Sequence, residues 1–163
     1  MLKGLAPVIA NRPTRLILGS MPSVASLEKK QYYGNPRNAF WPLMARLLGF
    51  EKHDFYTRNI EQIEQHGIAI WDVIGECERP GSLDSAIVKG SVRINPIPEL
   101  IAEHPSITRI GLNGGTAASL FKRHCLPRID TDRIEVFYLP STSPANARMN
   151  FEAKCKAWQE MLS

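Results

Sequence analysis

The chain has 163 residues, of which 44% are hydrophobic and 22% charged, and its formal net charge at pH 7 is +4. This length and composition are typical of one globular domain, so we expect residues 1–163 to form a single domain and exclude a largely disordered chain. The positive charge favours a polyanionic partner such as nucleic acid, although no dense Lys/Arg tract marks a binding face.

The cysteines and the apolar runs exclude several other classes of protein. Cys77, Cys125 and Cys155 are far apart, odd in number and form no CxxC pair, which argues against a disulfide framework and a cysteine metal cluster. Free thiols predict a reducing compartment. The N-terminus lacks the shape of a signal peptide, and no stretch approaches the ~20 apolar residues of a membrane span. We therefore expect a cytoplasmic or nucleoid-associated protein.

In the first half of the chain, two strands enclose two helices. Residues 15–19 form a nearly continuous apolar run that predicts a strand. Asn35-Pro36 then predicts the start of a helix, whose apolar residues follow at helical spacing until Gly49. Residues 56–66 predict a second helix, and the apolar run 67–72 predicts the next strand.

The second half of the chain repeats this alternation. Residues 108–112 and 134–139 predict two more strands, the latter with β-branched and aromatic residues. A helix is expected after Asn113-Gly114-Gly115, and the last helix carries an apolar stripe of Phe151, Cys155, Trp158 and Leu162. Alternating strands and helices predict an α/β fold, a three-layer α/β/α sandwich with a central four-stranded, mainly parallel sheet.

Small and polar residues follow all four predicted strands. In open α/β sheets the site lies at the carboxyl ends of the strands, so these residues are the first candidates for function. Gly19-Ser20-Met21-Pro22 has neither the glycine spacing nor the lysine of a phosphate loop. Ser20 or Ser141 could be a hydrolase nucleophile, but there is no GxSxG elbow. The four histidines fall in expected helix ends or loops: His53, His66, His104 and His124.

Three segments carry most of these residues: GSMPSVASLEKKQYYGNPRNAFW (19–41), WDVIGECERPGSLDSAI (71–87) and LPSTSPANA (139–147). Together and in this order they resemble the uracil-DNA glycosylase superfamily, most closely its hypoxanthine-DNA glycosylase branch. The resemblance implies an enzyme that extrudes a nucleotide from double-stranded DNA, at a cost of a few kcal/mol, and hydrolyses its N-glycosidic bond. Hypoxanthine is the expected base.

The resemblance also assigns residues to the base pocket. Tyr33 has the place of the aromatic that stacks on the flipped base, and Asp72 aligns with the strand-end residue that reads the base edge. A carboxylate there could accept from N1–H of hypoxanthine, and backbone amides near Ser20-Met21 could donate to O6. Gly19 and Asn113, at the ends of their strands, complete the expected base-binding set.

Two positions depart from better-known relatives. Met21 stands where many have the Asp or Asn that positions water, and Leu139 stands where many have a His or Asn that donates to the departing base. In the resembling branch an Asn of the NPRNAFW segment has the catalytic role, which points to Asn38. An amide at a helix N-terminus can orient water, and positioning and electrostatics would then supply the rate.

The segment LPSTSPANA matches the loop that enters the DNA minor groove in this family. It offers hydroxyls and backbone amides to phosphates and a short apolar wedge, so we expect it to bind DNA through Ser141, Thr142, Ser143, Pro144, Ala145 and Asn146. Lys29, Lys30 and Lys154 are interpreted as solvated charges, so no lysine is expected to form a Schiff base. The expectation is a monomeric, monofunctional glycosylase without metal or cofactor.

Three alternatives stay open from the sequence. The same fold could select uracil or xanthine. The chain could instead be a DNA-binding module without catalysis, or a small-molecule hydrolase that uses Ser20 or Ser141. A glycosylase assay on duplexes that carry each deaminated base separates most of these.

Overall fold

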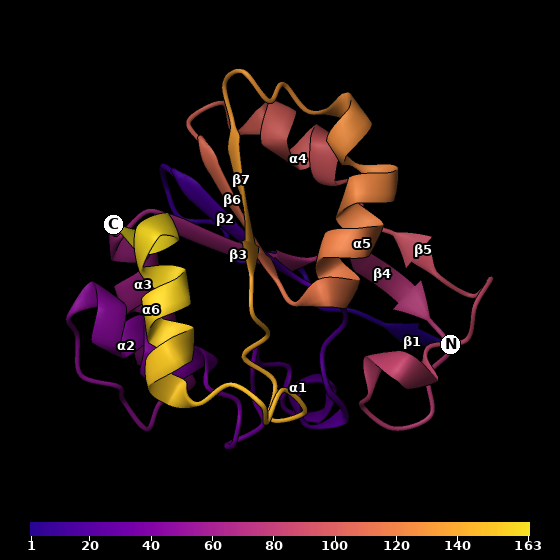
Figure 1. The fold of residues 1–163 in the computed structure, drawn as a ribbon, viewed down its shortest axis with the longest axis horizontal. Helices are drawn as coiled ribbons and strands as arrows, with labels where there is room; N and C mark the ends of the chain where they lie inside the picture. Colours follow the sequence, from indigo (N-terminus) through magenta and orange to yellow (C-terminus); the bar gives the residue numbers. More distant parts are fainter.

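Four parallel strands form the centre of the molecule in a computed structural model, which describes residues 1–163 (Figure 1). They are β2 (Arg15–Gly19), β3 (Ile68–Asp72), β6 (Arg109–Asn113) and β7 (Glu135–Leu139), in the order β3-β2-β6-β7. The apolar residues of the central strand β2 are fully buried because helices cover both faces of the sheet. The four predicted strands are confirmed, with starts or ends that differ by at most one residue.

Helices lie on both faces of this sheet (Figure 1). On one face are α2 (Phe40–Leu48), α3 (Tyr56–Gln65) and α6 (Phe151–Leu162); on the other are α4 (Ile97–Glu103) and α5 (Gly115–His124). The predicted three-layer α/β/α architecture is therefore confirmed. No helix combines the length and hydrophobicity that crossing a bilayer requires.

Several short elements were not predicted. A small antiparallel sheet has the order β1-β4-β5, from Leu2–Lys3, Ile74–Cys77 and Arg93–Ile94. The helices α1 (Val24–Lys29) and α4 and the 3-10 turns η1 (Asp84–Ala86) and η2 (Leu126–Arg128) were also missed. Elements of two to seven residues contain too few repeats for a periodic pattern, so their conformation depends on tertiary contacts.

The start of α2 corrects the sequence analysis. The helix begins at Phe40 and not at Asn35-Pro36. Residues 35–38 form a turn instead, in which the Asn38 N–H donates to the Asn35 carbonyl at 2.9 Å and the Arg37 N–H donates to Asn35 Oδ1 at 2.9 Å. Asparagine side chains compete with the helix for backbone N–H groups in this way. Asn38 therefore lies just before the helix and not in its first turn.

Lys154 is a second correction. It was expected to be solvated, but its residue is only 6% exposed, and burial lowers the pKa of its ammonium group. Lys154 lies four residues before the fully buried Trp158 and shares its face of α6. A lysine stem can cover apolar surface in this position. Lys29 and Lys30 are exposed, as expected.

Candidate active site

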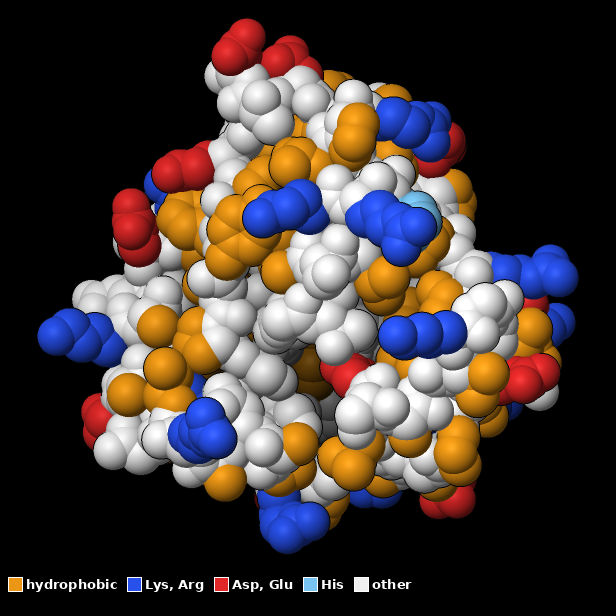
Figure 2. All heavy atoms as spheres, turned by 45° about the vertical axis from the view of Figure 1, so that its right-hand side comes forward, with side chains coloured by type: hydrophobic (Ala, Val, Ile, Leu, Met, Phe, Trp, Pro, Cys, Tyr) orange, Lys and Arg blue, Asp and Glu red, His pale blue; other side chains and the backbone are white.

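A cavity of about 420 Å³ opens at the carboxyl ends of the central strands. Every predicted site residue except Pro144 lines it, although these residues come from segments more than a hundred positions apart. Figure 2 shows the hollow on a face where Lys and Arg side chains surround it and most Asp and Glu side chains lie toward the edges. The folded chain thus assembles the positive surroundings that no single tract provides.

The Asp72 carboxyl group is buried in this cavity without a full set of partners. The residue is 5% exposed, and its Oδ2 atom has no hydrogen-bond partner in the protein. Burial and, secondarily, the nearby Asp84 raise the pKa of Asp72 to about 7, against an opposing effect of Arg79. A buried polar atom without a partner is costly, so this one is poised for a ligand.

Gly19 makes room for this carboxyl group. A Cβ atom at position 19 would lie 2.5 Å from Asp72 Oδ1 and 3.2 Å from the Tyr33 hydroxyl. Any other residue would push both side chains away from the strand end. The glycine at the end of β2 therefore sets how closely Asp72 and Tyr33 approach each other.

The backbone after Gly19 offers hydrogen-bond donors. The N–H groups of Ser20 and Met21 have no acceptor within the chain, and both residues line the cavity. The Met21 side chain is buried and packs in a small cluster with Ile74 and Cys77. Met21 thus anchors the turn through its side chain, and its backbone N–H is left without a partner in the protein.

Residues 82–85, which belong to the segment 71–87 but were not predicted as site residues, form another side of the cavity. The Ser20 hydroxyl donates to the Asp84 carboxylate at 2.9 Å, and the Val24 N–H donates to Ser82 Oγ at 3.0 Å. The buried Arg79 donates to the carbonyls of Gly81 and Pro22 at 2.7 and 2.8 Å. These bonds hold residues 79–85 against the turn after β2.

Tyr33 lies between Phe40 and the cavity. Its ring stacks on the Phe40 ring with centroids 3.8 Å apart and planes inclined by 14°. The backbone of Tyr33 has a φ of 55°, which is unusual for a residue other than glycine. Burial raises the pKa of its hydroxyl, with Asp72 adding to the effect. The hydroxyl is therefore neutral over the working pH range.

Asn113 and Thr142 join three separate segments. Asn113 Nδ2 donates to Thr142 Oγ1 at 3.0 Å and to the Tyr33 hydroxyl at 3.2 Å, and Asn113 Oδ1 accepts from the Thr142 N–H at 3.0 Å. The Thr142 carbonyl accepts from the Ala39 N–H at 2.9 Å. Since Thr142 is only 1% exposed, its hydroxyl serves this network and does not point toward solvent.

Asn38 presents its amide to the cavity in a defined orientation. Its Oδ1 atom accepts from the Phe40 N–H at 2.9 Å, which distinguishes the oxygen from the nitrogen. Oδ1 keeps a second lone pair, and Nδ2 has no partner in the protein. The group can therefore both accept from and donate to a water or substrate atom.

The loop after β7 is folded on itself. The Ser143 N–H donates to Ser141 Oγ, the Ala145 N–H donates to Ser143 Oγ, and Asn146 Nδ2 donates to the Ser141 carbonyl, all at 3.1 Å. These local bonds preset the shape of the loop. Ala145 is exposed at the rim of the cavity.

Some functional candidates could not have been found from spacing alone. Tyr32, Ser26 and the segment 82–85 line the cavity, and only tertiary contacts bring them there. Neither lysine nor histidine lines it. Ser20 and Ser141 therefore have no imidazole base beside them, which removes the arrangement that a serine hydrolase requires.

Comparisons with known proteins match most of the chain. Residues 7–162 match the family described as the uracil DNA glycosylase superfamily. A protein of Methanosarcina acetivorans named hypoxanthine DNA glycosylase is 36% identical over 152 residues, which cover 92% of each chain. One of the same name from Methanosarcina barkeri is 30% identical over 159 residues, which cover 97% of this chain and 96% of the relative.

A solved structure has the same fold. A protein of Methanosarcina acetivorans, determined by solution NMR and described as a uracil DNA glycosylase, superimposes with a TM-score of 0.82 at 32% sequence identity. The match covers 98% of this chain and 95% of that protein.

Proposed function

The chain belongs to the uracil DNA glycosylase superfamily, and on this basis we propose that it removes hypoxanthine from double-stranded DNA. It is a hydrolase that cleaves N-glycosidic bonds in DNA and excises deaminated bases. The observation that carries the choice of base is the buried, unpartnered Asp72 carboxyl group beside the free N–H groups of Ser20 and Met21. The two resembling proteins named hypoxanthine DNA glycosylase support the same choice.

Recognition of the base follows from the groups around the cavity. The target base leaves the duplex and stacks on the Tyr33 face that Phe40 does not cover. Its O6 accepts from the Ser20 and Met21 amides, and its N1–H donates to Asp72. Adenine presents an amino group where hypoxanthine presents O6, so two N–H donors at that point would face another donor. Undamaged adenine is thereby rejected.

Asn38 is the residue that positions the attacking water. The Phe40 N–H fixes the orientation of its amide, and the free lone pair of Oδ1 is available to a water molecule. An amide is a weak base, so the C1′–N bond must be largely broken before water adds. Positioning and electrostatics supply the rate, as they do when a fixed dipole faces developing charge.

Contact with DNA is assigned to the loop of Ser141–Asn146. Ser141 and Ser143 and the loop's backbone lie at the rim, where phosphates would pass, and Pro144-Ala145 fills the gap that the extruded nucleotide leaves. Thr142 contributes by holding the loop in place. The proposal includes one domain over residues 1–163, acting as a monomer in the cytoplasm near the nucleoid.

A single-turnover assay tests the proposal. Duplexes that carry hypoxanthine, uracil, xanthine or only normal bases are incubated with excess enzyme and then treated with alkali to cut abasic sites. We expect the fastest cleavage for hypoxanthine, and strand breaks only after alkali. Faster excision of uracil or xanthine would contradict the proposed base, and binding without excision would contradict the enzymatic function.

A further inference from the structure

The cavity contains few groups that can donate an acidic proton. Its titratable side chains are Asp72, Asp84, Tyr32 and Tyr33, with neither histidine nor lysine among them. The Tyr33 hydroxyl accepts from Asn113, and burial raises its pKa, so it is a weaker acid than Asp72. Tyr32 donates to the Ala6 carbonyl at 2.7 Å. Asp84 accepts from Ser20. Only the Asp72 carboxyl group is both buried and left with an unpartnered oxygen.

We propose that Asp72 acts in catalysis as a neutral carboxylic acid that donates a hydrogen bond to the departing base, and that Asp84 is a positioning residue that keeps it neutral. The inference rests on the proposed glycosylase function. A carboxylic acid held neutral by its surroundings is an effective donor to a developing oxyanion. Its carbonyl oxygen can still accept from N1–H, so one group matches both the N–H and the C=O of a lactam edge.

The negative charge that develops on the departing base favours the neutral form of Asp72. When the C1′–N9 bond breaks, its electron pair leaves with the purine, and negative charge spreads to O6. A neutral Asp72 stabilises this anion through its O–H group, whereas an ionised carboxylate would repel it. Water adds to C1′ and loses one proton to solvent, and the released purine takes one proton from solvent. Asp72 therefore keeps its proton throughout.

The surroundings of Asp72 hold the group in this form. Burial raises its pKa to about 7, and the charge of Asp84 acts in the same direction. Arg79 opposes them, but its Nε and Nη2 atoms donate to the Gly81 and Pro22 carbonyls, its Nη1 atom has no partner, and it forms no ion pair with Asp72. Tyr32 and Tyr33, the other titratable neighbours, have raised pKa values and bring no charge. The Ser20 hydroxyl keeps the Asp84 carboxylate at the cavity.

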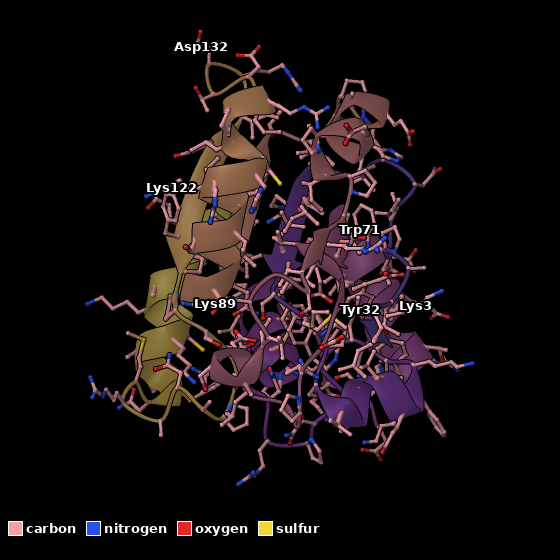
Figure 3. All side chains as sticks on the ribbon, turned by 90° about the vertical axis from the view of Figure 1, so that its right-hand side faces the viewer. Lys3, Tyr32, Trp71, Lys89, Lys122 and Asp132 are labelled. Carbon is pink, nitrogen blue, oxygen red and sulfur yellow. The ribbon has the colours of Figure 1, made fainter.

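The pH dependence of single-turnover excision tests the role. Between pH 5.5 and 9 the wild-type rate should be level at low pH and then fall by about tenfold per pH unit. Asp72→Asn should excise more slowly, because an amide is a weaker hydrogen-bond donor than a carboxylic acid, but its profile should be flat, because a neutral amide donates at every pH. Asp84→Asn should move the fall to lower pH. Asp132→Asn is the matched control, since Asp132 lies far from the cavity residue Tyr32 (Figure 3), and its profile should coincide with that of the wild type.

A second measurement does not depend on activity. Titration of the Asp72 carboxyl carbon by NMR, assigned by its loss in Asp72→Asn, should show a pKa well above that of an ordinary aspartate, and a lower one in Asp84→Asn. A wild-type rate that rises with pH, or a carboxyl group that titrates below pH 5, would overturn the role of Asp72 alone. Absence of excision at every pH would overturn the proposed function and this inference with it.

Discussion

Two walls of the cavity differ in whether their polar atoms have hydrogen-bond partners within the protein. The amide wall, made of Asn113, Thr142 and Tyr33, is closed by hydrogen bonds among its own members. The acidic wall, made of Ser20, Asp72 and Asp84, leaves an Asp72 oxygen and a backbone N–H of Ser20 without partners. A network in which every polar atom has a hydrogen-bond partner makes the amide wall rigid. Polar atoms without a partner in the free protein are available to bind a ligand. This difference separates the residues that position neighbouring groups from the residues that recognise the base.

Asn38 lines the cavity but belongs to neither wall, and its removal should have the largest effect. Asn38→Ala should raise the barrier to excision by roughly 2–4 kcal/mol, as loss of one preorganised dipole does in other enzymes, while the protein stays folded. Single-turnover rates and thermal melting measure the two effects. Asn35→Ala is the matched control, because Asn35 makes a similar turn bond but does not line the cavity. Equal rates in the two variants would remove Asn38 from the mechanism.

Disrupting the amide wall should lower the stability of the protein more than it changes recognition of the base. Asn113→Ala leaves the Thr142 N–H and hydroxyl and the Tyr33 hydroxyl without this partner, so the free energy of unfolding should fall by about 2–3 kcal/mol. Denaturant unfolding measures this change. Thr142→Ser keeps the hydroxyl and should remain within about 1 kcal/mol of the wild type. If Asn113→Ala unfolds like the wild type, the network is not a source of rigidity.

The acidic wall should make the free energy of unfolding depend on pH. Because the pKa of Asp72 is about 7 in the folded protein and ~3.9 in an unfolded chain, the folded state holds an extra proton between these values. Stability from this group therefore falls as pH rises, by about 1.4 kcal/mol between pH 5 and pH 6. Asp72→Asn should lack this loss, so the difference in unfolding free energy between the two proteins should change with pH. A constant difference would refute the raised pKa.

The smallest effect is expected at the rim, outside both walls. Replacement of Pro144-Ala145-Asn146 by glycines should weaken binding to abasic-site duplex by roughly three- to tenfold, or about 1 kcal/mol, whatever the flanking sequence. The ratio of hypoxanthine to uracil excision should stay nearly constant, because the base lies deeper. Titration with fluorescent duplexes and a parallel excision assay provide both values. Unchanged binding with a switched base preference would place this segment in the base pocket.

The sequence predicts the architecture well because the central strands are unambiguous. Residues 15–19 and 68–72 are nearly continuous apolar runs of the length of a strand, and a strand covered on both faces buries the side chains that point to either face. The site could be located for the same reason, since parallel strands carry the residues that follow them to one edge. The start of α2 was wrong because Asn35 and Asn38 bind backbone N–H groups locally, a competition that periodicity does not register.

The sequence by itself thus determined the sheet, its helical layers and the residues at the edge where the cavity opens. Only the tertiary structure decided which of those residues are free to act. Thr142 carries the same hydroxyl chemistry as Ser141, yet it is buried in a network with Asn113. Asp84 has no distinguishing spacing, yet its bond to Ser20 brings its charge toward Asp72. Hydrogen-bond partners and burial depend on contacts between distant segments, and these contacts exist only after the chain has folded.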